Sequence, residues 1–284
     1  MSDQGATKQR RLFCEISPLT YDMSVRKEIL KRWVKDVTHK TRFAKTFSEE
    51  PLPVLVHAHK SLMRRRLNNV DMTLQENKAK SLGVAAPKVS GVVIRPGETF
   101  SFWELVGPTT KRRGYTEGLT IVGSKPTAGV GGGMCQFTNL LHWMVLHTDL
   151  EIVEHHHHNA IDLFPDFGRQ VPFGSGTSIM YNYLDYRFKN TGDKTYQVIV
   201  YTTDEYLCGE IRCSDPLEIS VHIKERDAYF YEDGDDLIRH NKIYRKVVDP
   251  DTGDTIENTL LLENDAVVMY DHALVDKARI RSRP

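Results

Sequence analysis

The stretch of this chain best suited to covalent chemistry is Gly131-Gly132-Gly133-Met134-Cys135-Gln136, near its middle. Three consecutive glycines lose much backbone entropy on folding, so they indicate a turn that needs positive φ or a close backbone approach. Cys135 follows at the start of an expected helix, where free N–H groups and the helix dipole favour a thiolate. The pattern is typical of a reactive cysteine. A buried cysteine packed beside a glycine turn is the alternative.

The expected helix after the glycines runs from Cys135 to about His147. Its apolar residues recur with helical spacing and form one face: Phe137, Leu140, Leu141, Met144 and Val145. Asn139 and His142 lie four and seven residues after Cys135 and therefore share its flank. The helix is expected to pack on a sheet through the apolar face.

A thiol nucleophile needs a base within reach and donors for an oxyanion. Four consecutive histidines follow the helix in an expected strand over 150–158, and period 2 places His156 and His158 on one face. We predict that one of these two is the base, and that the donors are backbone N–H groups of residues 133–136. Asp185 either orients an imidazole or lies on a solvated strand face. This constellation predicts acyl transfer through a thioester.

A zinc site is the competing interpretation of the histidine run. His156 and His158 could both face a metal, but an H-x-H pair is a weak signal, and Cys208 and Cys213 lie in another segment. Those two cysteines are five residues apart in an expected strand, so they point to opposite faces and are not expected to pair. We therefore predict neither a metal nor a cofactor.

Composition excludes several classes of function. Of 284 residues, 40% are apolar and 27% are charged, as in globular proteins, and 38 basic residues balance 38 acidic ones, which gives no indication of nucleic-acid binding. A signal peptide needs an apolar run of about seven residues or more, and a membrane span needs about 20. Neither run occurs. The sequence therefore predicts no integral membrane segment and a cytoplasmic location.

Two helices and three strands are expected before the glycines, and the strands are 91–94, 99–103 and 114–122. Ser24 is expected to cap a helix that ends near Val37, and the helix's apolar stripe is expected to pack on the core. A capping box at Thr73 begins a second helix, which Gly83 and Pro87 are expected to end. The glycine-rich residues 123–133 are expected to form a loop.

The second half of the chain shows the pattern of an antiparallel meander. Its expected strands are 178–188, 195–202, 206–213 and 217–223. Asp249 to Asp254 resembles a calcium loop, but position 12 is Leu260 and not glutamate, so a hairpin turn is expected. The charged tail after His272 is expected to fray.

We therefore predict an α+β fold: a mixed or antiparallel sheet, a packed helix that bears the cysteine, and a β-rich C-terminal extension. The expected divisions are an N-terminal helical segment (1–50), a catalytic or binding domain (51–214) and the extension (215–284).

Several segments resemble the VanW family, and the resemblance covers about two thirds of the chain. They are Gln75-Glu76-Asn77-Lys78, Pro96 to Trp103, Gly131 to Gln136, Glu151 to Glu154, the pair His156 and His158, and Asp185 to Asn190. Some proteins with this domain resemble cysteine L,D-transpeptidases, which acylate a thiol with a peptidoglycan stem peptide and pass the acyl group to an amine.

The resemblance implies that Cys135 is the nucleophile and that His156 or His158 is its partner. The implied binding partner is a peptidoglycan-derived peptide or precursor. We predict that substrate contacts come from a short set of residues around the cysteine: Gly132, Gly133, Gln136, Asn139 and Trp103. The alternative function is that of a non-catalytic protein that binds cell-wall peptides or assists antibiotic resistance.

Overall fold

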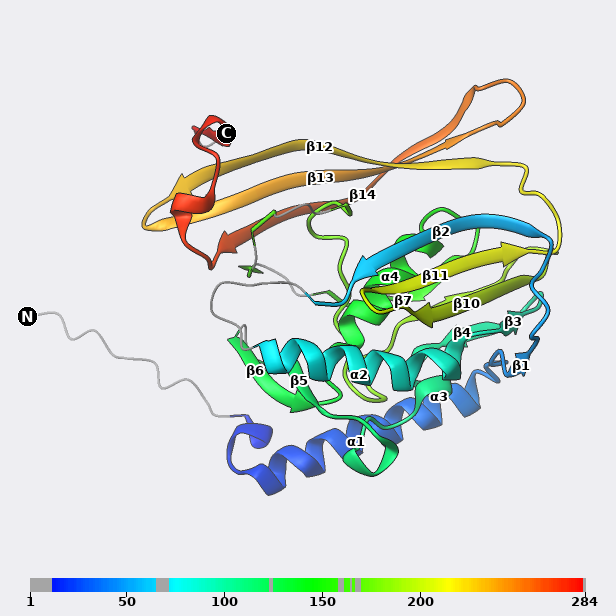
Figure 1. The fold of residues 1–284 in the computed structure, drawn as a ribbon, viewed down its shortest axis with the longest axis horizontal. Coiled ribbons are helices and arrows are strands. Elements are labelled where there is room, and N and C mark those ends of the chain that lie inside the picture. The colour runs from blue at the N-terminus through cyan, green and yellow to red at the C-terminus, as the bar shows by residue number, and fades with distance from the viewer. Residues whose placement is uncertain are drawn as a thin grey trace, which may run out of the picture. The chain divides into compact units, whose positions relative to one another are not determined.

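The computed structural model of the protein describes residues 12–64, 72–122, 125–157, 161–163, 165–166 and 170–282. The chain falls into two compact units that divide after Thr41. It combines helices with largely antiparallel sheets, which confirms the predicted α+β class (Figure 1). No helix in the described residues is long and apolar enough to cross a membrane.

The first unit contains the short 3-10 helix η1 (Phe13–Glu15) and the long helix α1 (Pro18–Thr38). Ser17 caps α1, because its Oγ accepts from the Thr20 N–H at 3.2 Å. The prediction that Ser24 is the cap was wrong, since Ser24 lies inside the helix and donates to the Thr20 carbonyl. The apolar stripe predicted to pack on a core contains no buried residue.

The second unit is built around a five-stranded antiparallel sheet. In spatial order its strands are β1 (Thr46–Phe47), β3 (Val92–Ile94), β10 (Tyr196–Thr202), β11 (Tyr206–Cys213) and β2 (Val54–Leu62). Strands β10 and β11 form the predicted hairpin. Cys208 is partly exposed and Cys213 is buried, so the two cysteines lie on opposite faces of β11, as predicted.

Helix α4 (Met134–Val145) carries Cys135 and packs against β11 and β2. Gly209 of β11 permits a close approach, because a Cβ there would lie 2.6 Å from Met144 Cε and 3.0 Å from Leu140 Cδ2. The apolar face of α4 is buried, as its spacing predicts. The sheet therefore fixes the helix that presents the cysteine.

Helix α2 (Met72–Val89) packs beside β10 and is longer than predicted. Gly83 and Pro87 do not end it. Its side chains Leu82 and Val89 are fully buried, and tertiary packing of this kind outweighs the local preference of single residues. Gly83 has no positive φ that would require glycine. A Cβ added there would also fit, because its nearest neighbour would be Thr202 Oγ1 at 3.9 Å.

The C-terminal extension forms a second sheet of three long antiparallel strands with a short parallel strand at each edge (Figure 1). In spatial order they are β15 (Ile280–Arg281), β12 (Ser220–Asp233), β13 (Asp236–Val248), β14 (Thr255–Val268) and β8 (Ile161–Asp162). The turn at Asp249 is the predicted hairpin turn, since Asp249 Oδ1 accepts from the N–H groups of Asp251 and Thr252. This sheet belongs to the same unit as the cysteine helix.

Smaller elements complete the second unit. They are the sheet β4 (Thr99–Ser101), β9 (Arg187–Lys189) and β7 (Glu151–Glu154), the hairpin β5 (Glu117–Val122) and β6 (Lys125–Val130), helix α3 (Phe102–Val106), and the 3-10 helices η2 (Lys111–Arg113), η3 (His272–Leu274) and η4 (Lys277–Arg279). Two predictions were wrong here. Residues 125–130 of the expected loop pair with β5, and residues 272–281 of the tail form two 3-10 helices, capped by Asp271 and Asp276, and the short strand β15.

Candidate active site

The glycine turn before Cys135 brings two backbones into contact. A Cβ at Gly132 would lie 2.3 Å from the carbonyl carbon of Gly118 in β5, which is closer than two unbonded atoms can approach. Gly133 is the N-cap of α4 with φ +105°, a conformation that L side chains rarely adopt. The aliphatic part of Lys78 from α2 lies directly over it. The close approach and positive φ predicted from the three glycines are thus confirmed.

Cys135 lies in the first turn of α4 and is partly exposed. Protein atoms nevertheless surround the thiol, and this desolvation raises the pKa of Cys135 above its ordinary value. Hydrogen bonds from the backbone N–H groups of Ile179 and of Cys135 itself act in the opposite direction and are weaker. The expectation of a thiol acidified by the helix terminus was therefore wrong. Cys135 rests as a neutral thiol at neutral pH.

The raised pKa of Cys135 predicts the pH dependence of its alkylation. Because only the thiolate reacts, the rate of iodoacetamide labelling should still rise above pH 8.5, where an ordinary cysteine is half ionised. Peptide mapping by mass spectrometry between pH 6 and pH 10 measures this rate for Cys135 alone, with a short cysteine peptide as the reference. A rate that levels off below pH 8 would contradict the prediction.

One segment, which we name the strap (residues 173–179), runs beside the flank of α4 that carries Cys135 and Asn139. The Ile179 N–H points to the Cys135 sulfur. Asn139 Oδ1 accepts from the Thr177 N–H at 2.6 Å and lies 2.9 Å from the Thr177 hydroxyl. Asn139, predicted to contact substrate, therefore holds the strap.

Along the histidine run, successive side chains point in opposite directions. His155 stacks on His142 of α4, with ring centroids 4.1 Å apart, and His157 stacks on His155. His156 turns away from this stack, and its Nε2 lies 2.9 Å from Glu154 Oε1. His158 lies outside the described residues. The structure thus brings His155, which was not predicted as a site residue, against the cysteine helix in place of His156.

The strap holds the stacked histidines by its carbonyl groups. His155 Nε2 lies 3.0 Å from the Gly176 carbonyl, and His157 bonds the Gly174 carbonyl. Desolvation lowers the pKa of both imidazoles, and the pKa of His142 lies well below its ordinary value for the same reason. These rings are therefore neutral at neutral pH. A neutral imidazole that donates from Nε2 keeps Nδ1 as a proton acceptor.

Asp185 is a fully buried structural residue and does not orient an imidazole. Its carboxylate accepts from Arg187 Nε at 2.7 Å, from Ser101 Oγ at 2.5 Å and from the Trp103 N–H at 3.1 Å. Burial raises the pKa of Asp185, and the Arg187 guanidinium opposes this. The prediction of a solvated strand face was wrong, because Asp185 precedes β9 and its side chain is fully buried among these donors.

Two residues predicted to bind substrate have structural partners. Trp103 is buried in the core, and its indole N–H donates to the Leu184 carbonyl at 3.0 Å, so it does not line a groove. Gln136 Nε2 donates to Ser61 Oγ and to the Leu62 carbonyl, both at 2.8 Å. The Gln136 N–H, predicted as an oxyanion donor, bonds the Gly133 carbonyl at 2.9 Å. Gln136 thus ties the start of α4 to the end of β2.

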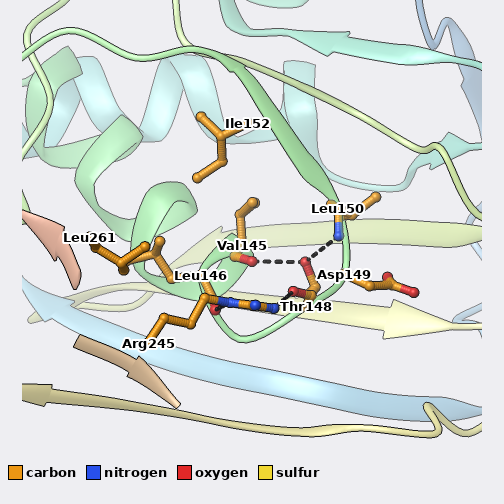
Figure 2. A pocket seen from close by; sticks show the side chains of 8 residues that line it. All are labelled: Val145, Leu146, Thr148, Asp149, Leu150, Ile152, Arg245 and Leu261. Atoms are coloured by element: carbon orange, nitrogen blue, oxygen red, sulfur yellow. Dashed lines mark hydrogen bonds between the residues drawn. The ribbon is translucent and has the colours of Figure 1, made fainter. Parts of the chain in front are cut away.

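A cavity of about 220 Å³ lies at the opposite end of α4 from Cys135. Figure 2 shows the side chains that line it: Val145, Leu146, Thr148, Asp149, Leu150, Ile152, Arg245 and Leu261. Arg245 of β13 donates to the Thr148 carbonyl at 2.8 Å and to the Leu146 carbonyl at 3.3 Å. These bonds satisfy carbonyl groups at and just beyond the helix C-terminus and place a positive charge at the negative end of its dipole.

No group of three or more potential metal ligands occurs within the part of the chain that the structure describes. The strap residues Thr177 and Ile179 were not predicted as site residues. Their signal in the sequence is the run Gly174-Ser175-Gly176-Thr177, whose two glycines permit close backbone approach. Gly174 has φ +86°.

Comparisons with known proteins identify relatives. A family described as "VanW like protein" matches residues 77–212. The Vancomycin B-type resistance protein VanW of Enterococcus faecalis is 33% identical over 228 residues, which are 80% of this chain and 82% of that protein. The uncharacterized protein YoaR of Bacillus subtilis is 33% identical over 119 residues, 40% of this chain and 36% of its own. No solved structure matches this chain.

Proposed function

This chain belongs to the VanW family, and from that premise we propose that it transfers acyl groups through a thioester on Cys135. The observation that carries the proposal is the built environment of this thiol: a glycine turn that admits no side chain, a helix N-terminus, and a strap whose Ile179 N–H points to the sulfur. Packing alone does not require all three around a partly exposed cysteine.

The reaction has two steps. In the first, the Cys135 sulfur bonds to a carbonyl carbon of a donor peptide, and the C–N bond to the following D-residue breaks. The thiol proton passes to an imidazole and then to the departing amine. In the second, an acceptor amine attacks the thioester carbon and gives one proton to the imidazole. The C–S bond breaks, and the proton returns to sulfur.

The imidazole of this scheme comes from the histidine run 155–158. Among the described histidines we assign this role to His155, because its ring stacks on His142 of the helix that carries Cys135 and is neutral at neutral pH. His156 is engaged by Glu154. Because the thiol and the imidazole are both neutral, the proton would move as the sulfur attacks, and not before substrate binds.

The proposed donors are peptidoglycan stem peptides or their precursors, and the support is the family relationship. The E. faecalis relative is named for vancomycin resistance. A second function, a non-catalytic accessory protein that binds such peptides, is favoured by one observation. The raised pKa of Cys135 leaves little thiolate at neutral pH.

Intact-mass spectrometry after incubation with a stem tetrapeptide that ends in a D-residue tests the proposal. We expect the wild-type protein to gain the mass of the acyl fragment and to release the D-amino acid. The Cys135→Ala variant should do neither, and Cys208→Ala, which removes another partly exposed thiol, should react like wild type. Peptide binding without an adduct in wild type would establish the accessory function instead.

A further inference from the structure

The C-terminal sheet makes direct contact with the strap beside Cys135. The family match ends at residue 212, and strands β12 to β14 follow it. The strap begins at Phe173, whose carbonyl oxygen accepts from Asn241 Nδ2 of β13 at 2.9 Å and from Asn264 Nδ2 of β14 at 3.4 Å. The same Asn264 amide donates to Asn241 Oδ1 at 2.7 Å.

This contact is built from buried polar groups. Asn241 is fully buried, and its amide also bonds the Glu225 carboxylate of β12. Buried amides are held in one orientation when each hydrogen bond has a partner, so the network fixes the position of the Phe173 carbonyl. A Cβ at Gly174 would lie 2.0 Å from Asn264 Nδ2, so the strap backbone lies directly against the sheet.

A buried arginine holds the other side of Phe173. The Arg239 guanidinium lies 4.4 Å from the centre of the Phe173 ring and bonds Asp162 and Asp166. Two of its carboxylate contacts come from Asp166, which gives the fork-to-fork geometry that fixes an arginine most firmly. Phe173 of the strap is thus held at two points, because Arg239 lies against its ring and Asn241 donates to its carbonyl group.

The rest of the strap reaches the candidate site within six residues. Gly176 bonds His155, Thr177 bonds Asn139, and Ile179 points its N–H to the Cys135 sulfur. Thr177 is buried. A displacement of the strap at Phe173 is therefore transmitted to the sulfur and to the stacked imidazoles through a short segment that is bonded at nearly every residue.

We propose that Asn241, Asn264 and Arg239 are positioning residues, and that the C-terminal sheet sets the active geometry of Cys135 through the strap. The inference deepens the proposed function, since it assigns a role in acyl transfer to strands β13 and β14, which lie outside the family match. None of the three residues touches the sulfur. They act through Phe173.

The test compares Asn241→Leu, which keeps the branched shape of the side chain but removes the donor, with Asn258→Ala, an exposed asparagine on β14. Loss of a buried donor to the Phe173 carbonyl should free the strap. We expect Cys135 to be alkylated about tenfold faster at pH 8, and acyl transfer to fall by about the same factor. Asn258→Ala should leave both rates at the wild-type value.

Cys213 distinguishes a freed strap from an unfolded protein. It is fully buried in β11, so it should stay unlabelled in a folded variant while Cys135 reacts. If Asn241→Leu does not fold, Asn264→Ala removes the longer of the two bonds at a partly exposed position and should give a smaller change in the same direction.

Two results are decisive. Equal Cys135 labelling in Asn264→Ala, Asn258→Ala and wild type would overturn the role of the sheet. If wild type forms no acyl adduct, the proposed function fails, but the labelling difference still tests whether the sheet positions Cys135.

Discussion

Replacing Asp185 with alanine is expected to lower the free energy of unfolding by about 3–5 kcal/mol, the range for breaking one partner out of a buried ion pair. Asp185 is fully buried, and its carboxylate accepts four hydrogen bonds. Three of the donors belong to β4, α3 and β9, so one side chain joins three elements. Alanine would remove the acceptor from the Trp103 and Tyr186 N–H groups and the 2.7 Å partner from Arg187.

Urea unfolding followed by circular dichroism measures this loss. Asp193→Ala is the matched control, because the Asp193 side chain is 95% exposed and lies 4.0 Å from Lys194. An exposed pair of this kind contributes little, so the control should stay within about 0.5 kcal/mol of wild type. Equal stabilities of the two variants would show that the Asp185 network does not hold the fold together.

The position of Cys135 was predictable because its signals are local. Three glycines and the helical spacing of Phe137 and Leu140 lie within a few residues of it, and short-range patterns record backbone conformation and one buried face. The meander of β10 and β11 was predictable for the same reason. The pKa of Cys135 was not, because desolvation depends on atoms that distant segments bring near the sulfur.

The choice of histidine was not predictable. Alternation separates the odd from the even members of the run 155–158, but it does not state which set faces α4. That choice depends on the register between the run and the strap, in which the Ser178 N–H bonds the His156 carbonyl and Gly176 bonds His155. The register joins residues about 20 positions apart, and no local pattern specifies it.

Asp185 and Arg187 are a case in which a local sequence rule predicted the wrong environment. Two charged residues at i and i+2 in a strand usually mark a solvated face. Here they bond each other, so the face is buried with its charges paired. The aromatic neighbours Tyr186 and Phe188 are also fully buried, which leaves β9 covered on both sides. In the sequence, the feature that could have indicated a buried ion pair was two opposite charges alternating with aromatic residues.

Replacing Gly132 with alanine is expected to destabilise the protein by about 3 kcal/mol and to abolish acyl transfer. The new Cβ would lie 2.3 Å from Gly118 C, 2.5 Å from Gly118 O and 2.7 Å from Gly118 Cα. All three atoms are backbone of β5, so no side-chain rotation relieves the overlap, and overpacking of this kind costs about 1–3 kcal/mol or more. Either β5 or the turn must move, and the turn carries the N-cap of the helix that begins beside Cys135.

Gly83→Ala separates this effect from the general cost of replacing a glycine. The nearest atom to its new Cβ would be Thr202 Oγ1 at 3.9 Å, so the methyl group fits. Gly83 lies inside α2, where alanine should stabilise the helix by roughly 0.5–1 kcal/mol. Urea unfolding and the acyl-adduct measurement should therefore show that Gly132→Ala loses both stability and adduct, whereas Gly83→Ala gains stability and keeps the adduct. A Gly132→Ala protein with wild-type stability and adduct would mean that β5 yields at no cost. The contact between the two backbones would then have no part in holding Cys135.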